Sequence, residues 1–290
     1  HYATDNTGCL AADPGHYVPS SGQNHQVPCP VGTYQPNSGQ SGCLVASPGY
    51  YTNVSSAAVQ QFPCHAGTYQ PNFGQPSCLD ADPGHFVLLQ MQTNQIPCAP
   101  GFYQPIAGQT SCFSASEGHY APGEASSQQL ECEPGTYADR RGFDACDLAD
   151  PGHYVPGSAA IEQLACSAGF NQPSMGMTEC LINDPGYYTS QSGTANPLAC
   201  PGGSYQPDSG GTGCLDADPG HYAPPPASTS QLPCAVGTYA PTEGTAVCTS
   251  ADPGYFVAEE GSSGQEACQA GTHQSDSGSS ECSENDPGYY

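Results

Sequence analysis

Apolar and polar positions along this chain recur with a fixed period. A glycine is followed two positions later by an aromatic residue, as in Gly15–Tyr17 and Gly32–Tyr34, and the pattern returns after 17 residues. The aromatic positions are Tyr17, Tyr34, Tyr51, Tyr69, Phe86, Tyr103, Tyr120, Tyr137, Tyr154, Tyr188, Tyr205, Tyr222, Tyr239 and Phe256. Self-similarity at a fixed period is the signature of a repeat protein. We therefore expect an array of 17-residue modules.

Each module predicts a small β-hairpin. Glycine, aromatic residue and proline in succession indicate a short extended segment, and a later glycine such as Gly39 indicates a turn. An apolar residue two positions before a cysteine, such as Val27 or Leu130, is expected on the return strand. Such a hairpin is not stable alone. We therefore expect modules to stack as in a solenoid, burying the aromatic stripe and the alanine positions between neighbours.

The cysteines occur in every second module. Their separations alternate between 20 and 14 residues, with a single 21. In the intervening modules alanine and glutamine stand fourteen residues apart instead, at Ala12/Gln26, Ala81/Gln95, Ala115/Gln129, Ala149/Gln163, Ala217/Gln231 and Ala251/Gln265. Asn183, Pro197 and Asn285 are exceptions, and Asn171 and His273 interrupt the aromatic series. The repeat is thus a 34-residue doublet.

Two disulfide pairings fit these spacings, one across fourteen residues and one across twenty. The first is favoured because alanine and glutamine replace two cysteines as a fourteen-spaced unit. It predicts Cys29–Cys43, Cys64–Cys78, Cys98–Cys112, Cys132–Cys146, Cys166–Cys180, Cys200–Cys214, Cys234–Cys248 and Cys268–Cys282. Each such loop stabilises a fold by roughly 3 kcal/mol in the chain-entropy model.

The favoured pairing leaves Cys9 unpaired, whereas the alternative leaves Cys282. Because the chain begins and stops within a repeat, we expect a window on a longer chain or a processed subunit, with the partner of Cys9 upstream or on a neighbouring subunit. The predicted repeats are 10–43, 44–78, 79–112, 113–146, 147–180, 181–214, 215–248 and 249–282, with partial repeats 1–9 and 283–290, in one continuous array.

The composition agrees with an array of modules that are cross-linked by disulfides. Gly and Pro contribute 36 and 30 of the 290 residues, Trp is absent and 36% of residues are hydrophobic. Such a chain cannot bury enough apolar surface to offset its entropy without cross-links. Seventeen cysteines indicate an oxidising compartment. We expect a small disulfide-rich all-β protein, an elongated solenoid without helices of note, at an extracellular or cell-surface location and without a membrane span.

The charge balance restricts the partners. There are 27 acidic residues against Arg140 and Arg141, a net charge of -25. This excludes the phosphate neutralisation that nucleic-acid binding requires. Basic surfaces, glycans and divalent cations remain as partners, besides self-association into a filament.

The module running from Cys29 through Pro30, Gly32 and Tyr34 to Cys43 resembles the ephrin-receptor-like cysteine-rich repeat, a relative of the TNF-receptor-like modules. The likeness extends over essentially the whole chain. It implies extracellular stalks, receptor ectodomains or appendage proteins, and no catalysis. This chain departs from the family in lacking every second disulfide, so the family's stacking geometry does not carry over directly.

Other candidate sites are modest. His16, His85, His119, His153 and His221 share a position with Tyr50, Tyr187 and Tyr255, so the position favours a flat ring rather than a metal ligand or a catalytic base. Asp in the Asp-Pro-Gly motifs is expected to accept backbone hydrogen bonds in turns, with Ca²⁺ binding at Asp80/Asp82 or Asp216/Asp218 as the alternative. No zinc or other metal site, cofactor motif or catalytic set is evident. The sequon at Asn53 is a candidate glycosylation site.

Two functions follow. The first is a structural protein of an extracellular fibre, filament, appendage or surface stalk, because the repeat is nearly uniform and shows no capping module. The second is a receptor or adhesin ectodomain that binds a protein or glycan on one solenoid face. Its candidate surfaces are the mild departures from the repeat at 52–61, 88–91 and 140–143.

Overall fold

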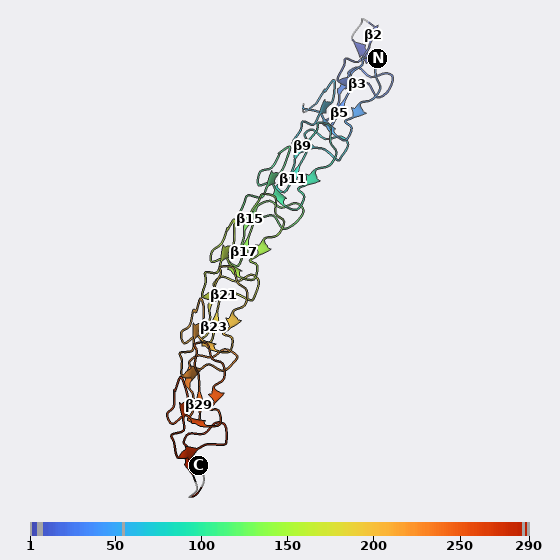
Figure 1. Cartoon of the computed structure of the whole chain (residues 1–290). Coiled ribbons are helices and arrows are strands. Elements are labelled where there is room, and N and C mark those ends of the chain that lie inside the picture. Colours follow the sequence, from blue (N-terminus) through green and yellow to red (C-terminus); the bar gives the residue numbers. More distant parts are fainter. Residues whose placement is uncertain (1, 5–7, 54–55, 286–287, 289–290) are drawn as a thin grey trace. The chain divides into compact units, whose positions relative to one another are not determined.

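The computed structural model describes residues 2–4, 8–53, 56–285 and 288. Within that part of the chain there is no helix, and 17 two-stranded sheets are each formed by two consecutive strands (Figure 1). The chain is therefore a small disulfide-rich all-β repeat protein, as predicted.

The strands of the first half are β1 (Tyr2–Thr4), β2 (Gly8–Leu10), β3 (His16–Tyr17), β4 (Val27–Pro28), β5 (Thr33–Tyr34), β6 (Leu44–Val45), β7 (Tyr50–Tyr51), β8 (Phe62–Pro63), β9 (Thr68–Tyr69), β10 (Leu79–Asp80), β11 (His85–Phe86), β12 (Ile96–Pro97), β13 (Phe102–Tyr103), β14 (Phe113–Ser114), β15 (His119–Tyr120), β16 (Leu130–Glu131) and β17 (Thr136–Tyr137). Those of the second half are β18 (Asp147–Leu148), β19 (His153–Tyr154), β20 (Leu164–Ala165), β21 (Phe170–Asn171), β22 (Leu181–Ile182), β23 (Tyr187–Tyr188), β24 (Leu198–Ala199), β25 (Ser204–Tyr205), β26 (Leu215–Asp216), β27 (His221–Tyr222), β28 (Leu232–Pro233), β29 (Thr238–Tyr239), β30 (Thr249–Ser250), β31 (Tyr255–Phe256), β32 (Glu266–Ala267), β33 (Thr272–His273) and β34 (Ser283–Glu284).

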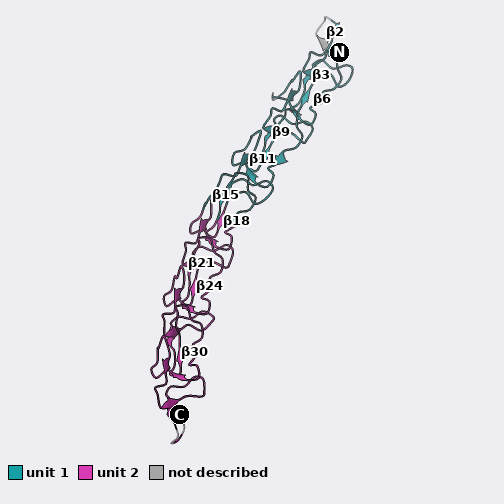
Figure 2. Cartoon of the chain, in the orientation of Figure 1, with its two compact units in different colours: residues 1–132, 138–147, 159–161 teal, residues 133–137, 148–158, 162–290 magenta. Residues whose placement is uncertain are grey.

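The chain divides into two compact units (Figure 2). The first comprises residues 1–132, 138–147 and 159–161, and the second comprises 133–137, 148–158 and 162–290. Each unit is by itself an elongated series of hairpins.

A single hairpin shows how the module forms. β5 and β6 pair antiparallel, with Tyr34 opposite Leu44. The same register places Val27 opposite Tyr17, so the apolar residue lies on the return strand, as predicted. Gly39 has φ 72°, a left-handed conformation that glycine adopts without steric cost. Five modules place another residue in that conformation at the equivalent position: Ala57, Met91, Ala125, Ala159 and Ala227.

Neighbouring modules are joined by backbone hydrogen bonds. The Gly15 amide donates to the Gln35 carbonyl at 2.8 Å, and the Gly39 amide donates to the Ala12 carbonyl at 2.7 Å. Equivalent bonds recur along both units, as from Gly101 to Ala121 and from Gly186 to Gln206. Each short hairpin therefore gains in the stack the backbone partners that an isolated hairpin leaves to water.

A second contact joins most modules to the one two places further along. The glycine before the aromatic residue packs against the backbone of the later module's turn. A Cβ built on Gly101 would lie 2.2 Å from the Gly142 carbonyl oxygen, and one on Gly15 would lie 2.3 Å from that of Ala57. Real Cβ atoms do not approach an oxygen so closely. The glycine of the Gly-x-aromatic motif is thus required by close packing as well as by its φ of 84° at Gly101.

Small residues form the core. The first cysteine of each pair from Cys29 to Cys166 is 0% exposed, as are most alanines at the equivalent position, such as Ala12 and Ala81. The residue after the aromatic is buried too: Val87 and Val155 in some modules, glutamine in others. Because these side chains are small, hydrophobic burial supplies little stability per module, and covalent and backbone links supply the rest.

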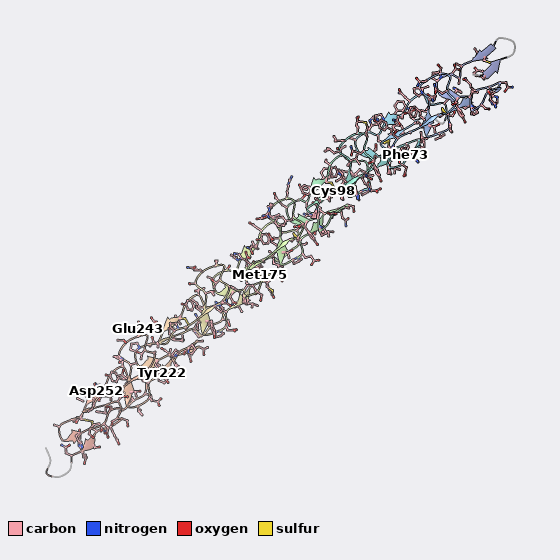
Figure 3. All side chains as sticks on the ribbon, turned by 90° about the vertical axis from the view of Figure 1, so that its right-hand side faces the viewer. Phe73, Cys98, Met175, Tyr222, Glu243 and Asp252 are labelled. Carbon is pink, nitrogen blue, oxygen red and sulfur yellow. A yellow bond between two sulfur atoms is a disulfide. The ribbon has the colours of Figure 1, made fainter. Side chains whose placement is uncertain are left out.

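The expected burial of the aromatic stripe is wrong. Tyr17, Tyr34, Tyr51, Tyr69, Phe86, Tyr103, Tyr120, Tyr137, Tyr154, Tyr188, Tyr205, Tyr222, Tyr239 and Phe256 are all half-buried rather than enclosed. Two of the rings contact a ring on the opposite strand of their own hairpin: Tyr51 contacts Phe62 with ring centroids 5.9 Å apart, and Tyr103 contacts Phe113 at 6.0 Å. In a two-residue strand successive side chains point to opposite faces, so the residue after the ring points inward. At the turns, Phe73 and Met175 project outward (Figure 3).

The structure joins the fourteen-spaced cysteines. The bonds are Cys29–Cys43, Cys64–Cys78, Cys98–Cys112, Cys132–Cys146, Cys166–Cys180, Cys200–Cys214, Cys234–Cys248 and Cys268–Cys282. Among the described residues Cys9 has no disulfide partner, and its side chain is exposed. The repeat boundaries predicted above remain a proposal.

Glutamine takes over the role of the disulfide in the intervening modules. The Gln163 side-chain oxygen accepts a hydrogen bond from the Asp150 amide at 2.6 Å, and its nitrogen donates to the Asp150 carboxylate at 2.7 Å. We call this two-bond contact the Gln–Asp clamp. It recurs at Asp13/Gln26, Asp82/Gln95, Asp218/Gln231 and Asp252/Gln265. Gln61 and Gln129 make only the backbone bond, to the amides of Ser47 and Ser116.

The packing of Gly101 yields a first prediction. Gly101→Ala and Gly142→Ala both place alanine at a φ above 80°, but a Cβ on Gly142 meets nothing within 4 Å. We expect both variants to lose about 1–2 kcal/mol from the left-handed conformation. Gly101→Ala should lose about 1–3 kcal/mol more from overpacking. Urea unfolding of the two variants measures the difference, and equal losses would contradict the packing argument.

The clamp yields a second prediction. Ala149→Cys with Gln163→Cys should form a ninth disulfide in this array of eight, because Ala149 and Gln163 occupy the cysteine positions of the module. The loop contributes roughly 3 kcal/mol, against about 1 kcal/mol for the lost hydrogen bonds. A rise of roughly 2 kcal/mol in unfolding free energy is expected, with the link located by non-reducing peptide mass mapping. Gln163→Cys alone is the control and should destabilise; if the double variant stays reduced, the equivalence of the two positions is wrong.

Candidate functional site

The Asp-Pro-Gly motifs serve the fold in a way the sequence reading missed. The turn is closed by the Asp150 backbone carbonyl, which accepts from the His153 amide at 2.9 Å. The carboxylate accepts its hydrogen bond from Gln163 rather than from the backbone. In the suggested calcium pair Asp80/Asp82, the Asp82 carboxylate is likewise held by Gln95. Among the described residues no three His, Cys, Asp or Glu side chains gather to hold a metal ion.

The residues that interrupt the aromatic series form hydrogen bonds with the residues that interrupt the alanine series. Asn171 replaces the aromatic residue, Asn183 replaces the alanine twelve residues later, and the Asn171 amide donates to the Asn183 side-chain oxygen at 2.9 Å. His273 and Asn285 repeat the exchange, with a ring nitrogen 2.8 Å from the side-chain oxygen. A polar residue at the alanine position therefore requires a hydrogen-bonding residue where the ring usually stands.

Asn183 is wholly buried and fully hydrogen-bonded. Its side-chain nitrogen donates to the Thr189 hydroxyl at 3.0 Å and to the Gly211 carbonyl at 3.2 Å. The Thr189 hydroxyl also accepts from the Gly169 amide at 2.9 Å and donates to the Phe170 carbonyl. This polar network replaces the small apolar core of other modules, and it turns Asn171 inward.

The same module lacks a Gln–Asp clamp. Pro197 stands where other modules carry glutamine, and it has no side-chain amide to offer Asp184. Within the described part of the chain, the Asp184 carboxylate has no hydrogen-bond partner or ion pair, while its backbone carbonyl still accepts from the Tyr187 amide at 3.1 Å. Asp184 therefore occupies the position of the aspartates that form Gln–Asp clamps but has no glutamine partner.

A surface hollow lies at this module. Its volume is about 260 Å³, and it is lined by Asn171, Leu181, Ile182, Asp184, Tyr187 and Pro197. We call it the Asp184 hollow. Leu181 is the cross-strand partner of Asn171 and in other hairpins would face an aromatic ring. Leu181 is 47% exposed, much like Leu44 and Leu79, which face Tyr34 and Tyr69.

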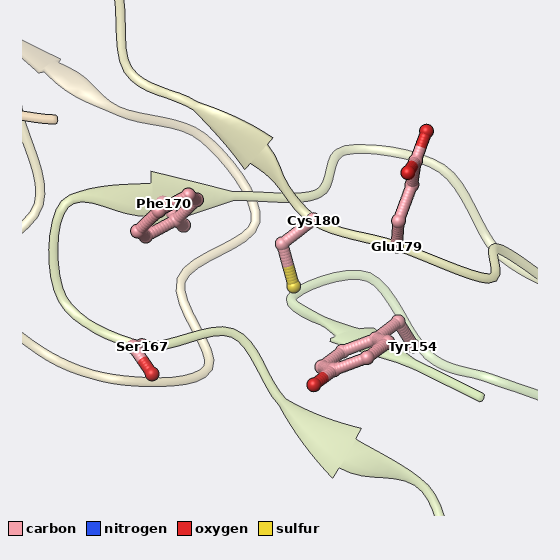
Figure 4. Close-up of a pocket in the computed structure, with 5 residues that line it drawn as sticks. All are labelled: Tyr154, Ser167, Phe170, Glu179 and Cys180. Atoms are coloured by element: carbon pink, nitrogen blue, oxygen red, sulfur yellow. The ribbon is translucent and has the colours of Figure 1, made fainter. Parts of the chain in front are cut away.

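A second hollow of about 290 Å³ lies beside the same strand β21, lined by Tyr154, Ser167, Phe170, Glu179 and Cys180. Figure 4 shows Phe170 and Tyr154 on either side of Cys180, with the Glu179 carboxylate directed away from both rings. Phe170 stands where most cysteine modules have threonine or serine. This second hollow presents two rings but no charged group toward its interior.

Two of the departures named in advance make contacts within the fold, and their role as binding surfaces stays a prediction. Phe143 is buried against Cys132 and Ala138, and the Arg140 guanidinium lies 4.5 Å from the centroid of the Phe143 ring. Segment 140–143 therefore contributes to the core. In segment 88–91, Met91 has a positive φ and accepts a contact from the Tyr50 hydroxyl.

The remaining site predictions are not tested by these contacts. In segment 52–61, Asn53 is exposed, but Val54 and Ser55 of its sequon lie outside the described residues, so glycosylation there remains a prediction. The histidine rings, such as His153, rest near backbone carbonyls two residues earlier. The Asp184 hollow was missed by the sequence reading, although the loss of glutamine at position 197 was its visible signal.

The exchange at Asn171 and Asn183 yields a third prediction. Asn171→Tyr should cost about 1–3 kcal/mol, because the buried Asn183 oxygen loses its donor. Asn183→Ala added to it restores the usual pair of residues, so the double variant should be more stable than the two single losses together imply, by about 0.5–3 kcal/mol. A double-mutant cycle in urea measures the coupling, and strict additivity would contradict the pairing of the exceptions.

Comparisons with known proteins bear on the repeat itself. Residues 15–62 match the family model described as tyrosine-protein kinase ephrin type A/B receptor-like. No curated protein matches the chain. Among the described residues, no helix is long and apolar enough to cross a membrane. The ephrin-receptor-like cysteine-rich module is not itself catalytic.

The predicted resemblance is thus confirmed where the match lies, and the fourteen-spaced disulfides and hairpins continue beyond it through both units. Together with an oxidised cysteine set, this indicates an extracellular or secreted protein. Residues 15–62 match the ephrin-receptor-like repeat, and the chain as a whole is a disulfide-rich array of β-hairpin modules.

Proposed function

We propose that this chain is a structural protein of an extracellular fibre, appendage or surface stalk. The observation that carries the proposal is the uniform backbone linkage between modules. The amide of the Gly-x-aromatic glycine donates to the next module again and again, as Gly84 does to Gln104 and Gly220 does to Ala240. Such linkage transmits tension through hydrogen bonds and disulfides rather than through one large core.

Two further properties support a mechanical role. The modules bury mainly alanine, cysteine and valine, so each is held by a disulfide or a Gln–Asp clamp instead of a large side chain. With only Arg140 and Arg141 as basic residues, the chain offers few cleavage sites to proteases of basic specificity. Both properties suit a protein exposed outside the cell.

A fourth prediction tests this function. Purified chain should assemble, in a concentration-dependent way, into fibres many times longer than one molecule, seen by negative-stain electron microscopy and followed by sedimentation. Cys9→Ser is the matched control, because it removes the exposed free thiol without touching the eight disulfides. Fibres that persist in Cys9→Ser support assembly through the array. Monodisperse particles at all concentrations would refute a self-assembling fibre.

A second candidate is an ectodomain of a receptor or adhesin. It is supported by the description of the matched family model, which names ephrin-receptor-like tyrosine kinases. Here the array would hold a binding surface away from the cell. Specific capture of a protein or glycan by discrete, unassembled chains would favour this candidate over the fibre.

A further inference from the structure

Three departures from the repeat converge on the Asp184 hollow. Asn171 replaces a ring, Asn183 replaces an alanine, and Pro197 replaces a glutamine. The first two satisfy each other by a buried hydrogen bond, and Asn171 lines the hollow together with Leu181. The third has no such compensation, because nothing among the described residues takes the place of the glutamine beside Asp184.

The cost of this arrangement to the fold is the lost clamp. In five other modules the equivalent carboxylate accepts a hydrogen bond from glutamine at 2.6–2.8 Å. Asp184 keeps the charge and the position but faces a hollow lined by Leu181, Ile182 and Pro197. A hydrogen-bonding cation stabilises a carboxylate beside apolar walls more than it stabilises the same group in open water.

The hollow has the shape and chemistry for one side chain. At about 260 Å³ it is smaller than most sites for drug-sized ligands. Leu181, Ile182 and Pro197 give it apolar walls, Asp184 gives it a negative charge, and Tyr187, 37% exposed, is also part of its lining. A guanidinium group fits this set best, because it is planar, stacks on aromatic rings and bonds carboxylates through two parallel donors.

We propose that the Asp184 hollow binds an arginine side chain of a basic partner protein. Leu181 and Ile182 contact the aliphatic part of that side chain, Asp184 binds its guanidinium, and Tyr187 stacks against it. Charge complementarity favours such a partner over a second copy of this chain, because a second copy offers only Arg140 and Arg141 as cationic side chains against 27 acidic ones. The inference does not rest on the fibre function.

The fifth prediction uses a minimal probe. The acetylated and amidated peptide Gly-Arg-Gly is titrated into the full chain, and backbone amide shifts are followed by heteronuclear NMR. The same peptide with citrulline, an uncharged isostere of arginine, is the ligand control. We expect saturable shifts at Leu181, Ile182 and Tyr187 with the arginine peptide and none with the citrulline peptide.

Three variants separate the hollow from general electrostatics. Asp184→Asn should weaken binding at least about tenfold, since it removes a charged hydrogen-bond acceptor. Pro197→Gln keeps the net charge and restores the missing glutamine, which should engage Asp184 in a clamp and weaken binding to a similar extent. Glu162→Gln removes one charge from an exposed position outside the hollow and should leave the affinity within about twofold.

Each outcome decides the proposal. Loss of binding in Asp184→Asn and Pro197→Gln, with retention in Glu162→Gln, supports it. It is wrong if the citrulline peptide binds equally well, if shifts spread evenly over all acidic modules, or if Pro197→Gln binds like the unchanged chain. It is also wrong if sedimentation shows that the hollow is already occupied by a second copy that the peptide fails to displace. Disulfide mass mapping and circular dichroism establish that each variant is folded before titration.

Discussion

The close approach of a glycine to the backbone of a module two places further along is the constraint on which the rest of this structure depends. It brings modules near enough for the amide of the same glycine to reach the carbonyl of the next module. At that distance most of the buried side chains are alanine, cysteine, valine or glutamine, with small polar residues such as Asn183 and Thr189 in a few modules. The thin core is therefore a consequence of the close stacking, and the disulfides and clamps compensate for it.

In this close stacking, a residue of the module is replaced only together with the residues that contact it. A disulfide is replaced by alanine together with glutamine and, in five modules, aspartate. A ring and an alanine are replaced by two polar residues that bond each other, as at Asn171 and Asn183. The reason is the same in both cases, since a buried or half-buried polar group left without a partner costs more than the contact it replaces. Pro197 is an exception to this pattern: Asp184 lacks a glutamine partner there, but it is exposed rather than buried.

An array built in this way can combine a mechanical role with local recognition. The backbone linkage is independent of side chains on the outer faces, so those positions vary without disturbing the stack. The two hollows beside β21 show the result, because one is lined by rings and the other by a carboxylate and aliphatic groups. Binding at such a place would use the array as a support rather than as a catalyst.

The sequence by itself determined the 34-residue doublet, the all-β hairpins, the turn glycines and the resemblance to the ephrin-receptor-like repeat, because each depends on local periodicity and on backbone preferences. It left two disulfide pairings open and placed the aromatic rings inside. The tertiary structure decided both points: the cysteines fourteen residues apart meet, and the residue after each ring points inward. Only the structure joined Asn171 to Asn183 and separated Asp184 from any partner among the described residues, because those relations depend on which side chains meet across strands and modules.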